Sequence, residues 1–452
     1  MNLKPGENPS MPCTPFRISA LALVLLLLSG CGGSAGGSGG SGGGSGGGNG
    51  GGGGTPTTVT FTITGATPTA VATQIGSGQF TAATLTSGKL TLSLPSGTAN
   101  FAVAFVCPPY SSAYTGVPLQ TIEKVYEAST LDGTSFSYGC PEFLPTGTTG
   151  TLTGTVDESA IPGASILYLF AQGASQRDEA EIVSASPFSL AVPAGTDRVL
   201  VLAVAETISN GNQVAVAARN FNGVAVPGAL NDGNTVVLGA ADEVTQQAIT
   251  YSGVPLSFNT PATTVTYLMA GQVGGGVPIL ADSAVGQYPA LPAGAMQSGD
   301  YYSFTTILTD LAGNQMGVFQ NSTTGGPLSV AFPAAWSYAG PTPAALPAFD
   351  LAYSGFSGNT GVIDSAILTW PLTGATQSVL QVFATGDYLN GSTTLTVPNF
   401  SSLTGFLAAP ASATQVSWVA TIGQESYPSF QQPIPANSTI TTVSSMGTYT
   451  VP

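Results

Sequence analysis

Histidine is absent from this chain of 452 residues, and lysine and arginine together number only 7. Without histidine the protein can form neither a Ser-His-Asp nor a Cys-His catalytic arrangement, and it can hold no histidine-ligated metal. No cation follows Arg219, and the 22 acidic residues give a formal net charge of −15. An acidic chain so poor in cations repels phosphate backbones, which excludes nucleic acid as a partner.

Charged residues of both signs make up only 6% of the chain, whereas hydrophobic residues make up 43%. A typical soluble domain has about 25% charged residues. The chain is too apolar to be disordered, so its surface must be covered mainly by uncharged polar residues and glycine. A length prior of roughly 100 to 200 residues per domain predicts two to four domains.

Long hydrophobic runs are also missing, and the longest is the segment Ile18–Leu28 near the N-terminus. It is too short to span a bilayer, which takes about 20 residues. With Arg17 before it, the segment is typical of a signal peptide, and either Met1 or Met11 is the start.

The motif Leu28-Ser29-Gly30-Cys31 resembles the lipobox of bacterial lipoproteins. The resemblance implies cleavage before Cys31 and acylation of its sulfur and amine, which would anchor the protein to the lipid bilayer. Gly32 in place of aspartate implies the outer membrane, where the cell has one. The alternative is an ordinary secretory signal with a chance cysteine at its end.

Residues 32–54 are almost entirely glycine and serine, which predicts a flexible tether. Its r.m.s. span is about 25 Å, and fully stretched it reaches about 80 Å. The predicted organisation of this part is a signal peptide over 1–30, followed by the lipidated cysteine and linker over 31–56.

From residue 57 onward the sequence has a period of two. Val59–Thr64 and Leu90–Leu94 alternate apolar residues with Thr, Ser or other polar residues, which predicts half-buried strands. Turn residues recur about every ten positions. No convincing amphipathic helix stands out, and the best short candidate is Ser175–Val183. The sequence therefore predicts an all-β protein.

A weak internal repeat suggests several similar units. Leu92–Phe105 aligns with Leu190–Ala203, and Ala290–Gly294 and Leu395–Pro398 carry shorter echoes of the same phrase. Steps of about one hundred residues favour tandem immunoglobulin-like β-sandwiches. The phrase resembles those of transthyretin-like and carboxypeptidase-regulatory-like sandwiches, although the same phrase also serves as a common strand-turn-strand. The predicted units are 57–148, 149–250, 251–352 and 353–452.

Cys107 and Cys140 are the cysteines left after the predicted lipid site and the removed segment. An even pair in an exported domain predicts a disulfide, which would stabilise the first unit by roughly 3 to 4 kcal/mol. A metal or redox role is disfavoured by the wide spacing and the lack of histidine.

Carboxylates are the remaining candidates for catalysis. A glycosidase needs two carboxyl groups about 5 to 9.5 Å apart across a cleft. The acidic groups that could supply one are Asp157-Glu158, Asp178-Glu179-Glu181 and Asp242-Glu243. Calcium is conceivable at Asn231–Asn234 or Asp310–Asn314. Solvated acids and ordinary Asx turns explain all of these groups more simply, so no catalytic residue, metal site or cofactor is predicted.

Aromatic residues give the best indication of ligand binding. On alternating strands Tyr302 and Phe304 share one face, as do Trp336 and Tyr338, so each pair could stack on sugar rings. The alternative is that these rings belong to the core. The sequence as a whole predicts a lipid-anchored cell-envelope protein with a structural, adhesion or binding role and no enzymatic activity. Carbohydrate capture is the second hypothesis and a carboxylate-dependent glycosidase the third, and envelope glycans or proteins are the candidate partners.

Overall fold

The computed structural model describes a folded body that begins at Pro56 and runs to the C-terminus with interruptions. The described residues are 56–109, 119–141, 148–173, 177–206, 213–270, 276–283, 286–356, 358–359, 361–372, 376–427, 435 and 437–452. The predicted signal peptide, Cys31 and the tether lie outside them. Within this part of the chain, no helix is long and apolar enough to cross a membrane.

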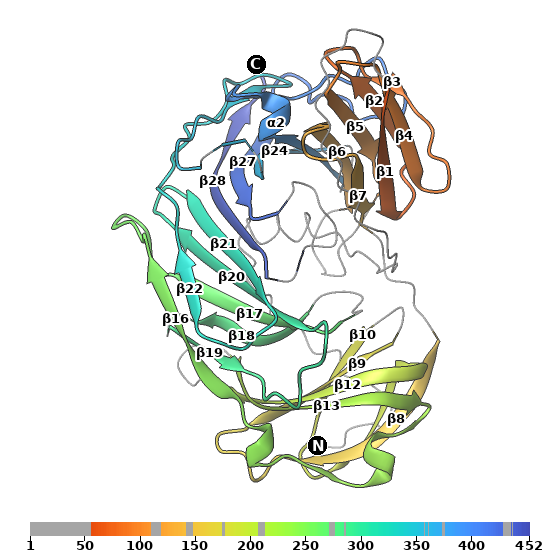
Figure 1. The fold of residues 1–452 in the computed structure, drawn as a ribbon, viewed down its shortest axis with the longest axis vertical. Helices are drawn as coiled ribbons and strands as arrows, with labels where there is room; N and C mark the ends of the chain where they lie inside the picture. The colour runs from red at the N-terminus through yellow and green to blue at the C-terminus, as the bar shows by residue number, and fades with distance from the viewer. Residues whose placement is uncertain are drawn as a thin grey trace, which may run out of the picture.

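Most strands belong to one sixteen-stranded sheet, which bends into an arc (Figure 1). Its strands in spatial order are β10 (Arg177–Ile182), β9 (Ile166–Gln172), β12 (Gly195–Glu206), β13 (Gln213–Val226), β18 (Val277–Ser283), β17 (Ala262–Leu268), β20 (Tyr301–Thr309), β21 (Gln315–Ser322), β28 (Thr439–Thr450), β27 (Gln415–Glu425), β24 (Val362–Pro371), β25 (Thr376–Thr385), β6 (Leu119–Ser129), β5 (Asn100–Val106), β2 (Ala70–Ile75) and β3 (Thr81–Ala82).

The remaining strands form small sheets that cover the large one. These strands are β4 (Lys89–Leu94), β1 (Thr57–Gly65) and β7 (Ser135–Cys140); β11 (Pro187–Pro193), β8 (Thr149–Asp157), β14 (Gly228–Ala229) and β15 (Val236–Val237); β19 (Gln287–Ala290), β16 (Thr245–Ser252) and β22 (Leu328–Ala331); and β23 (Ala348–Asp350) with β26 (Thr394–Thr396). The helical elements described are η1 (Leu230–Gly233), η2 (Ala240–Asp242) and α2 (Gly386–Leu389). The all-β prediction is confirmed.

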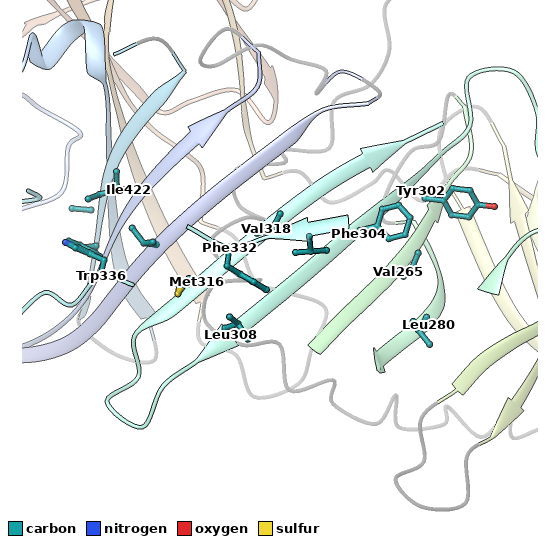
Figure 2. Packing of buried hydrophobic residues seen from close by; sticks show 14 of the residues in the cluster. Val265, Leu280, Tyr302, Phe304, Leu308, Met316, Val318, Phe332, Trp336 and Ile422 are labelled. Atoms are coloured by element: carbon teal, nitrogen blue, oxygen red, sulfur yellow. The ribbon is translucent and has the colours of Figure 1, made fainter. Parts of the chain in front are cut away.

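Alternation along the strands builds the core. In β20 the side chains of Tyr302, Phe304, Thr306 and Leu308 are buried, while the residues between them are partly exposed. Figure 2 shows several such side chains packed together between the layers. Because successive side chains in a strand point to opposite faces, β20 packs one face against the covering strands and leaves the other partly exposed, whereas β5, β6 and β25 are buried on both faces along most of their length. The result is β-sandwich packing.

The short helix considered over Ser175–Val183 is wrong, because β10 occupies Arg177–Ile182 and pairs antiparallel with β9. Local charge spacing can imitate a helix, but here strand pairing with β9 overrides it. As an outer strand, β10 carries several charges, and β3 at the other end of the sheet has two residues. Both features oppose further pairing at the sheet edges.

Pairing between distant parts of the chain keeps the sheet continuous. β21 pairs antiparallel with β28, and β25 pairs parallel with β6 from Thr376↔Leu119 to Ala384↔Glu127. The largest core cluster draws residues from all four predicted ranges. The division into four units therefore stays a prediction, since both the sheet and this cluster run through the proposed boundaries.

The seam between β13 and β18 has a single described residue pair, Val214↔Leu280. Here a side-chain network joins the two sides. Arg198 on β12 donates to both carboxylate oxygens of Asp300 at 2.6 and 2.5 Å, and to the Tyr267 hydroxyl at 3.1 Å. Asn220 on β13 donates to the Ala295 carbonyl at 2.8 Å. Charged and polar contacts thus supplement the short ladder.

Candidate functional site: an aromatic depression

Four aromatic rings cluster where the segment between β22 and β23 crosses the sheet. Trp336 stacks on Tyr338 with ring centroids 5.5 Å apart and an interplanar angle of 3°. Tyr338 meets Trp418 of β27 edge to face at 5.5 Å, and Phe349 of β23 lies 6.3 Å from Trp418. Such offset and edge-to-face pairs add about 0.5 to 1.5 kcal/mol beyond the area they bury.

Two of the predicted ligand-binding rings are corrected by the structure. Tyr302 and Phe304 share one face of β20, as expected, but they are only 0% and 1% exposed. Their rings contact Tyr288 of β19, and the Tyr302 hydroxyl accepts from the Leu291 amide at 2.9 Å. A ring enclosed on all sides offers no surface to a ligand, so both are core residues.

Trp336 is also largely enclosed, whereas Tyr338 is not. The Trp336 side chain is 9% exposed, and its Nε1 donates to the Ala352 carbonyl at 3.1 Å. Trp336 therefore supports Tyr338 from behind, and its own predicted contact with a ligand is corrected to this supporting role. Tyr338 is only partly buried and lines an open depression of about 590 Å³.

Three separate parts of the chain form the wall of this depression. The turn between β20 and β21 contributes Asn314, the segment 337–343 contributes Tyr338 and Gly340, and β27 and β28 contribute Trp418 and Tyr449. The remaining lining residues are neutral, namely Ala312, Ser337, Ala339, Pro341, Pro343, Ser445, Met446, Gly447 and Thr448. No charged side chain is among them.

Glycine makes room for the indole of Trp418. A Cβ on Gly340 or on Gly447 would lie 2.8 Å from Cζ2 of Trp418, closer than real Cβ contacts come. Gly447 is the cross-strand partner of Trp418, and Gly340 has a φ of 97°, which favours glycine. Glycines therefore allow the backbone to approach the ring on two sides.

Hydrogen bonds hold the three parts together. The Ser445 hydroxyl donates to Asn314 Oδ1 at 2.8 Å and contacts the Tyr338 carbonyl at 3.0 Å. Asn314 Nδ2 donates to Asp310 Oδ2 at 2.8 Å. These bonds join β28, the β20–β21 turn and the crossing segment, so the wall is preorganised in the absence of any ligand.

Among the described residues, the Tyr449 hydroxyl on this wall has no hydrogen-bond partner. Tyr449 is 8% exposed, and its buried hydroxyl makes no hydrogen bond within the described structure. Burial raises the pKa of this hydroxyl to about 12, so it remains protonated and can donate as well as accept. Leaving such a group unsatisfied costs about 1 to 3 kcal/mol. Tyr449 is therefore a residue of interest that sequence reasoning missed. Its position in a strand looks ordinary in the sequence and does not indicate that its hydroxyl is buried without a partner.

The calcium candidates are turns held by their own hydrogen bonds, an Asx turn at Asp310 and reciprocal side-chain bonds between Asn231 and Asn234. Asp310 Oδ1 accepts from the amides of Ala312 and Asn314 at 2.9 and 2.8 Å. Asn231 and Asn234 each donate a side-chain amide to the other's carbonyl at 3.4 and 3.2 Å. Among the residues that the structure describes, no cluster of three or more His, Cys, Asp or Glu could hold a metal.

Of the predicted carboxylate groups, Asp157 and Asp242 have partners in the described structure, and the side chain of Asp178 lies outside it. Asp157 Oδ1 accepts from the Ser159 amide at 2.9 Å, and Asp242 forms an ion pair with Arg219. Glu158 is buried, and its Oε2 accepts no hydrogen bond from the residues that the structure describes. Asp157 therefore belongs to a turn and Asp242 to an ion pair.

Three other carboxyl groups are buried near the β25–β6 seam, and sequence reasoning missed them. Burial raises the pKa of Glu123 and of Asp364 to about 7 and that of Glu127 to about 8. The Leu407 amide donates to Glu123 at 2.8 Å, which opposes the shift. The strand containing Glu123 and Glu127 has adjacent charged residues and adjacent apolar residues instead of alternation, so its sequence does not show that the charged positions face the interior.

Cys107 and Cys140 form a disulfide with Cα atoms 5.3 Å apart. It joins the end of β5 to the end of β7, across the layers of the sandwich that contains β1 and β4. Cys31 lies outside the described residues.

No protein-family model matches the chain, and no curated protein matches it. Two solved structures show a distant likeness. The TIE protein of Bacillus anthracis is 14% identical, over 61% of this chain and 50% of that one, with a TM-score of 0.13. A mutant of the major pilin from Streptococcus pyogenes is 8% identical, over 53% and 99%, with a TM-score of 0.11. This chain thus spans about half the length of the TIE protein, and likeness at these scores assigns neither family nor function.

Proposed function

We propose that the protein is a lipid-anchored component of the bacterial cell envelope with a structural, adhesion or binding role and no enzymatic activity. The observation that carries the proposal is the sixteen-stranded sheet, in which β21 pairs with β28 and β25 with β6. Backbone pairing between distant parts of the chain gives an extended body that resists deformation. Such a body suits holding or presenting a surface.

The sequence supplies the means of attachment. Acylation of Cys31 would place up to three acyl chains at one end of a glycine-rich segment, and two chains suffice for stable anchoring. The tether could lift the folded body by as much as about 80 Å from the bilayer. The Cys107–Cys140 disulfide is typical of an oxidising, exported environment. Gly32 favours the outer membrane, where the cell has one.

Anchoring can be tested with a Cys31→Ala variant of the full chain in a bacterial host. Wild-type protein should incorporate radiolabelled palmitate and sediment with membranes, whereas Cys31→Ala should do neither. Cys13→Ala, which lies upstream of the predicted cleavage site, is the matched control and should behave as wild type. Membrane association of Cys31→Ala equal to wild type would contradict the proposal.

Carbohydrate capture is a second candidate, and a specific observation favours it. The depression beside Tyr338 is neutral, partly aromatic and of a size typical of small-ligand sites, about 300 to 1,000 Å³. Under this candidate the anchored body would hold an envelope glycan at a fixed distance from the membrane.

A further inference from the structure

We propose that the aromatic depression binds a neutral oligosaccharide through Tyr338 and the Tyr449 hydroxyl. This inference rests on the second candidate function and deepens it by naming a ligand class and a site. Its test is separate from the anchoring test above, so each can fail alone.

Charge selects the class of ligand. None of the residues that line the depression is charged, and the chain as a whole has a net charge of −15. An anionic polymer would find no cation here and would meet an acidic protein surface. A cation would find no carboxylate in the lining. A neutral ligand avoids both costs.

The chemistry of the wall fits a saccharide. Sugar rings have apolar C–H faces that pack on aromatic rings, and hydroxyl groups that exchange hydrogen bonds with neutral polar groups. The depression offers the partly exposed ring of Tyr338, and the exposed hydroxyl-bearing residues Ser337 and Thr448 at its rim. A few polar groups set among apolar ones is the usual composition of a small-ligand site.

The Tyr449 hydroxyl provides the specific contact. It is buried in a residue that lines the depression, and it has no partner in the described structure. Most buried polar groups are satisfied by protein or by ordered water, so an orphan at a ligand-sized depression needs an explanation. Its oxygen has almost no accessible surface in the unliganded structure, so a sugar hydroxyl, directly or through one water molecule, would satisfy it after a small shift of the wall on binding.

Preorganisation supports binding at this place. Trp336 supports the back of the Tyr338 ring, and the Ser445 hydroxyl contacts both Asn314 and the Tyr338 backbone. A wall whose side chains are already fixed loses little conformational freedom when a ligand arrives. The affinity of an open site depends strongly on how little conformational entropy is lost on binding.

The experiment is a calorimetric and tryptophan-fluorescence titration of purified full-length protein in detergent. The probes are hexameric cello-, xylo-, manno- and chito-oligosaccharides, with hexameric oligogalacturonate as the charged comparison. At least one neutral hexamer should bind saturably, and oligogalacturonate should not. Trp418 at the depression and Trp336 beside it should report the binding as a change in emission.

Three variants locate the site. Tyr449→Phe removes only the hydroxyl and should weaken binding about three- to tenfold, the value of one neutral hydrogen bond. Tyr338→Ala removes the exposed ring and should weaken it more than tenfold. Tyr168→Phe is the matched control, because it removes a hydroxyl that accepts from Gln213 on distant strands, and it should bind as wild type.

Each remaining outcome overturns the inference. Absence of binding to every neutral hexamer refutes the ligand class, and preferential binding of oligogalacturonate does the same. Equal affinity in wild type and Tyr449→Phe refutes the hydroxyl contact, and equal affinity in Tyr338→Ala as well refutes the site. If Tyr338→Ala does not fold, Tyr449→Phe decides the question, since it keeps the ring and its packing.

Discussion

Replacing Arg198 with methionine should weaken the side-chain network that joins β12 to Asp300 and to Tyr267 of β17 across the β13–β18 seam. Arg198 donates to both oxygens of Asp300, whose side chain is fully buried, while the Arg198 side chain is 13% exposed. Methionine keeps much of the length of the arginine stem and removes the charge. The perturbation therefore leaves a buried carboxylate without its counter-ion at a seam that has little strand pairing of its own.

The expected loss of stability depends on which hydrogen-bond donors Asp300 keeps in the variant. Removing one partner of a buried ion pair typically costs about 3 to 5 kcal/mol. Burial alone would raise the pKa of Asp300, but hydrogen bonds from Arg198, Tyr267 and the Ala270 and Gln297 amides hold it below its ordinary value. Three of those donors remain in the variant, so we expect the lower end, about 3 kcal/mol.

Amide hydrogen exchange measures the effect where it acts. The Ala270 and Gln297 amides donate to Asp300 at 2.8 and 2.7 Å, so their protection reports whether the junction is closed. A loss of about 3 kcal/mol corresponds to roughly 100-fold faster exchange through opening of this region. In a double-mutant cycle, Arg198→Met and Asp300→Asn should couple by about 1 to 3 kcal/mol.

A matched change at a more exposed ion pair provides the control. Arg219 pairs with Asp242, and the Arg219 side chain is 35% exposed. Arg219→Met should therefore cost less than Arg198→Met, about 1 kcal/mol, because solvent reaches the arginine side of this pair and screens it, although Asp242 itself is buried. The reasoning is refuted if exchange at Ala270 and Gln297 accelerates no more in Arg198→Met than in Arg219→Met, or if the two changes in the cycle are simply additive.

Three further predictions concern stability. Cys140→Ser should lower the free energy of unfolding by about 3 to 4 kcal/mol, measured by urea denaturation, because the disulfide closes a loop with a sequence separation of 33; a midpoint equal to that of reduced wild type is the accompanying control. Burial raises the pKa values of Glu127 to about 8 and Asp364 to about 7. The folded state then binds more protons than the unfolded state above about pH 4, so stability should fall as the pH rises from 5 to 8, on the order of 2 kcal/mol per group. Thermal denaturation of the Glu127→Gln, Asp364→Asn double variant should show a flatter dependence, and an unchanged slope would contradict this. Gly447→Ala should cost about 1 to 3 kcal/mol, because its Cβ would overlap the indole it faces; calorimetry showing an unchanged melting temperature would argue against the contact.

Local pattern was enough to predict the class of fold. The alternation in β1 and β4 follows from the two-residue period of a strand, and any sandwich would display it. The prediction that Cys107 pairs with Cys140 needed only an even cysteine count in a domain expected to be exported, and the structure shows the disulfide. The helix considered over Ser175–Val183 failed because a short charged segment has no reliable period, and its partner β9 decided its conformation.

The sequence alone determined that this protein is built from strands and that Tyr302 with Phe304, and Trp336 with Tyr338, would share faces. Only the tertiary structure decided which face each pair occupies, because alternation says that two side chains point the same way but not what covers them. The same limit hid Tyr449, which meets Tyr338 at one depression through strand pairing and chain crossings between distant segments. Period and composition are local properties, whereas burial and the assembly of a site depend on which distant segments pack together.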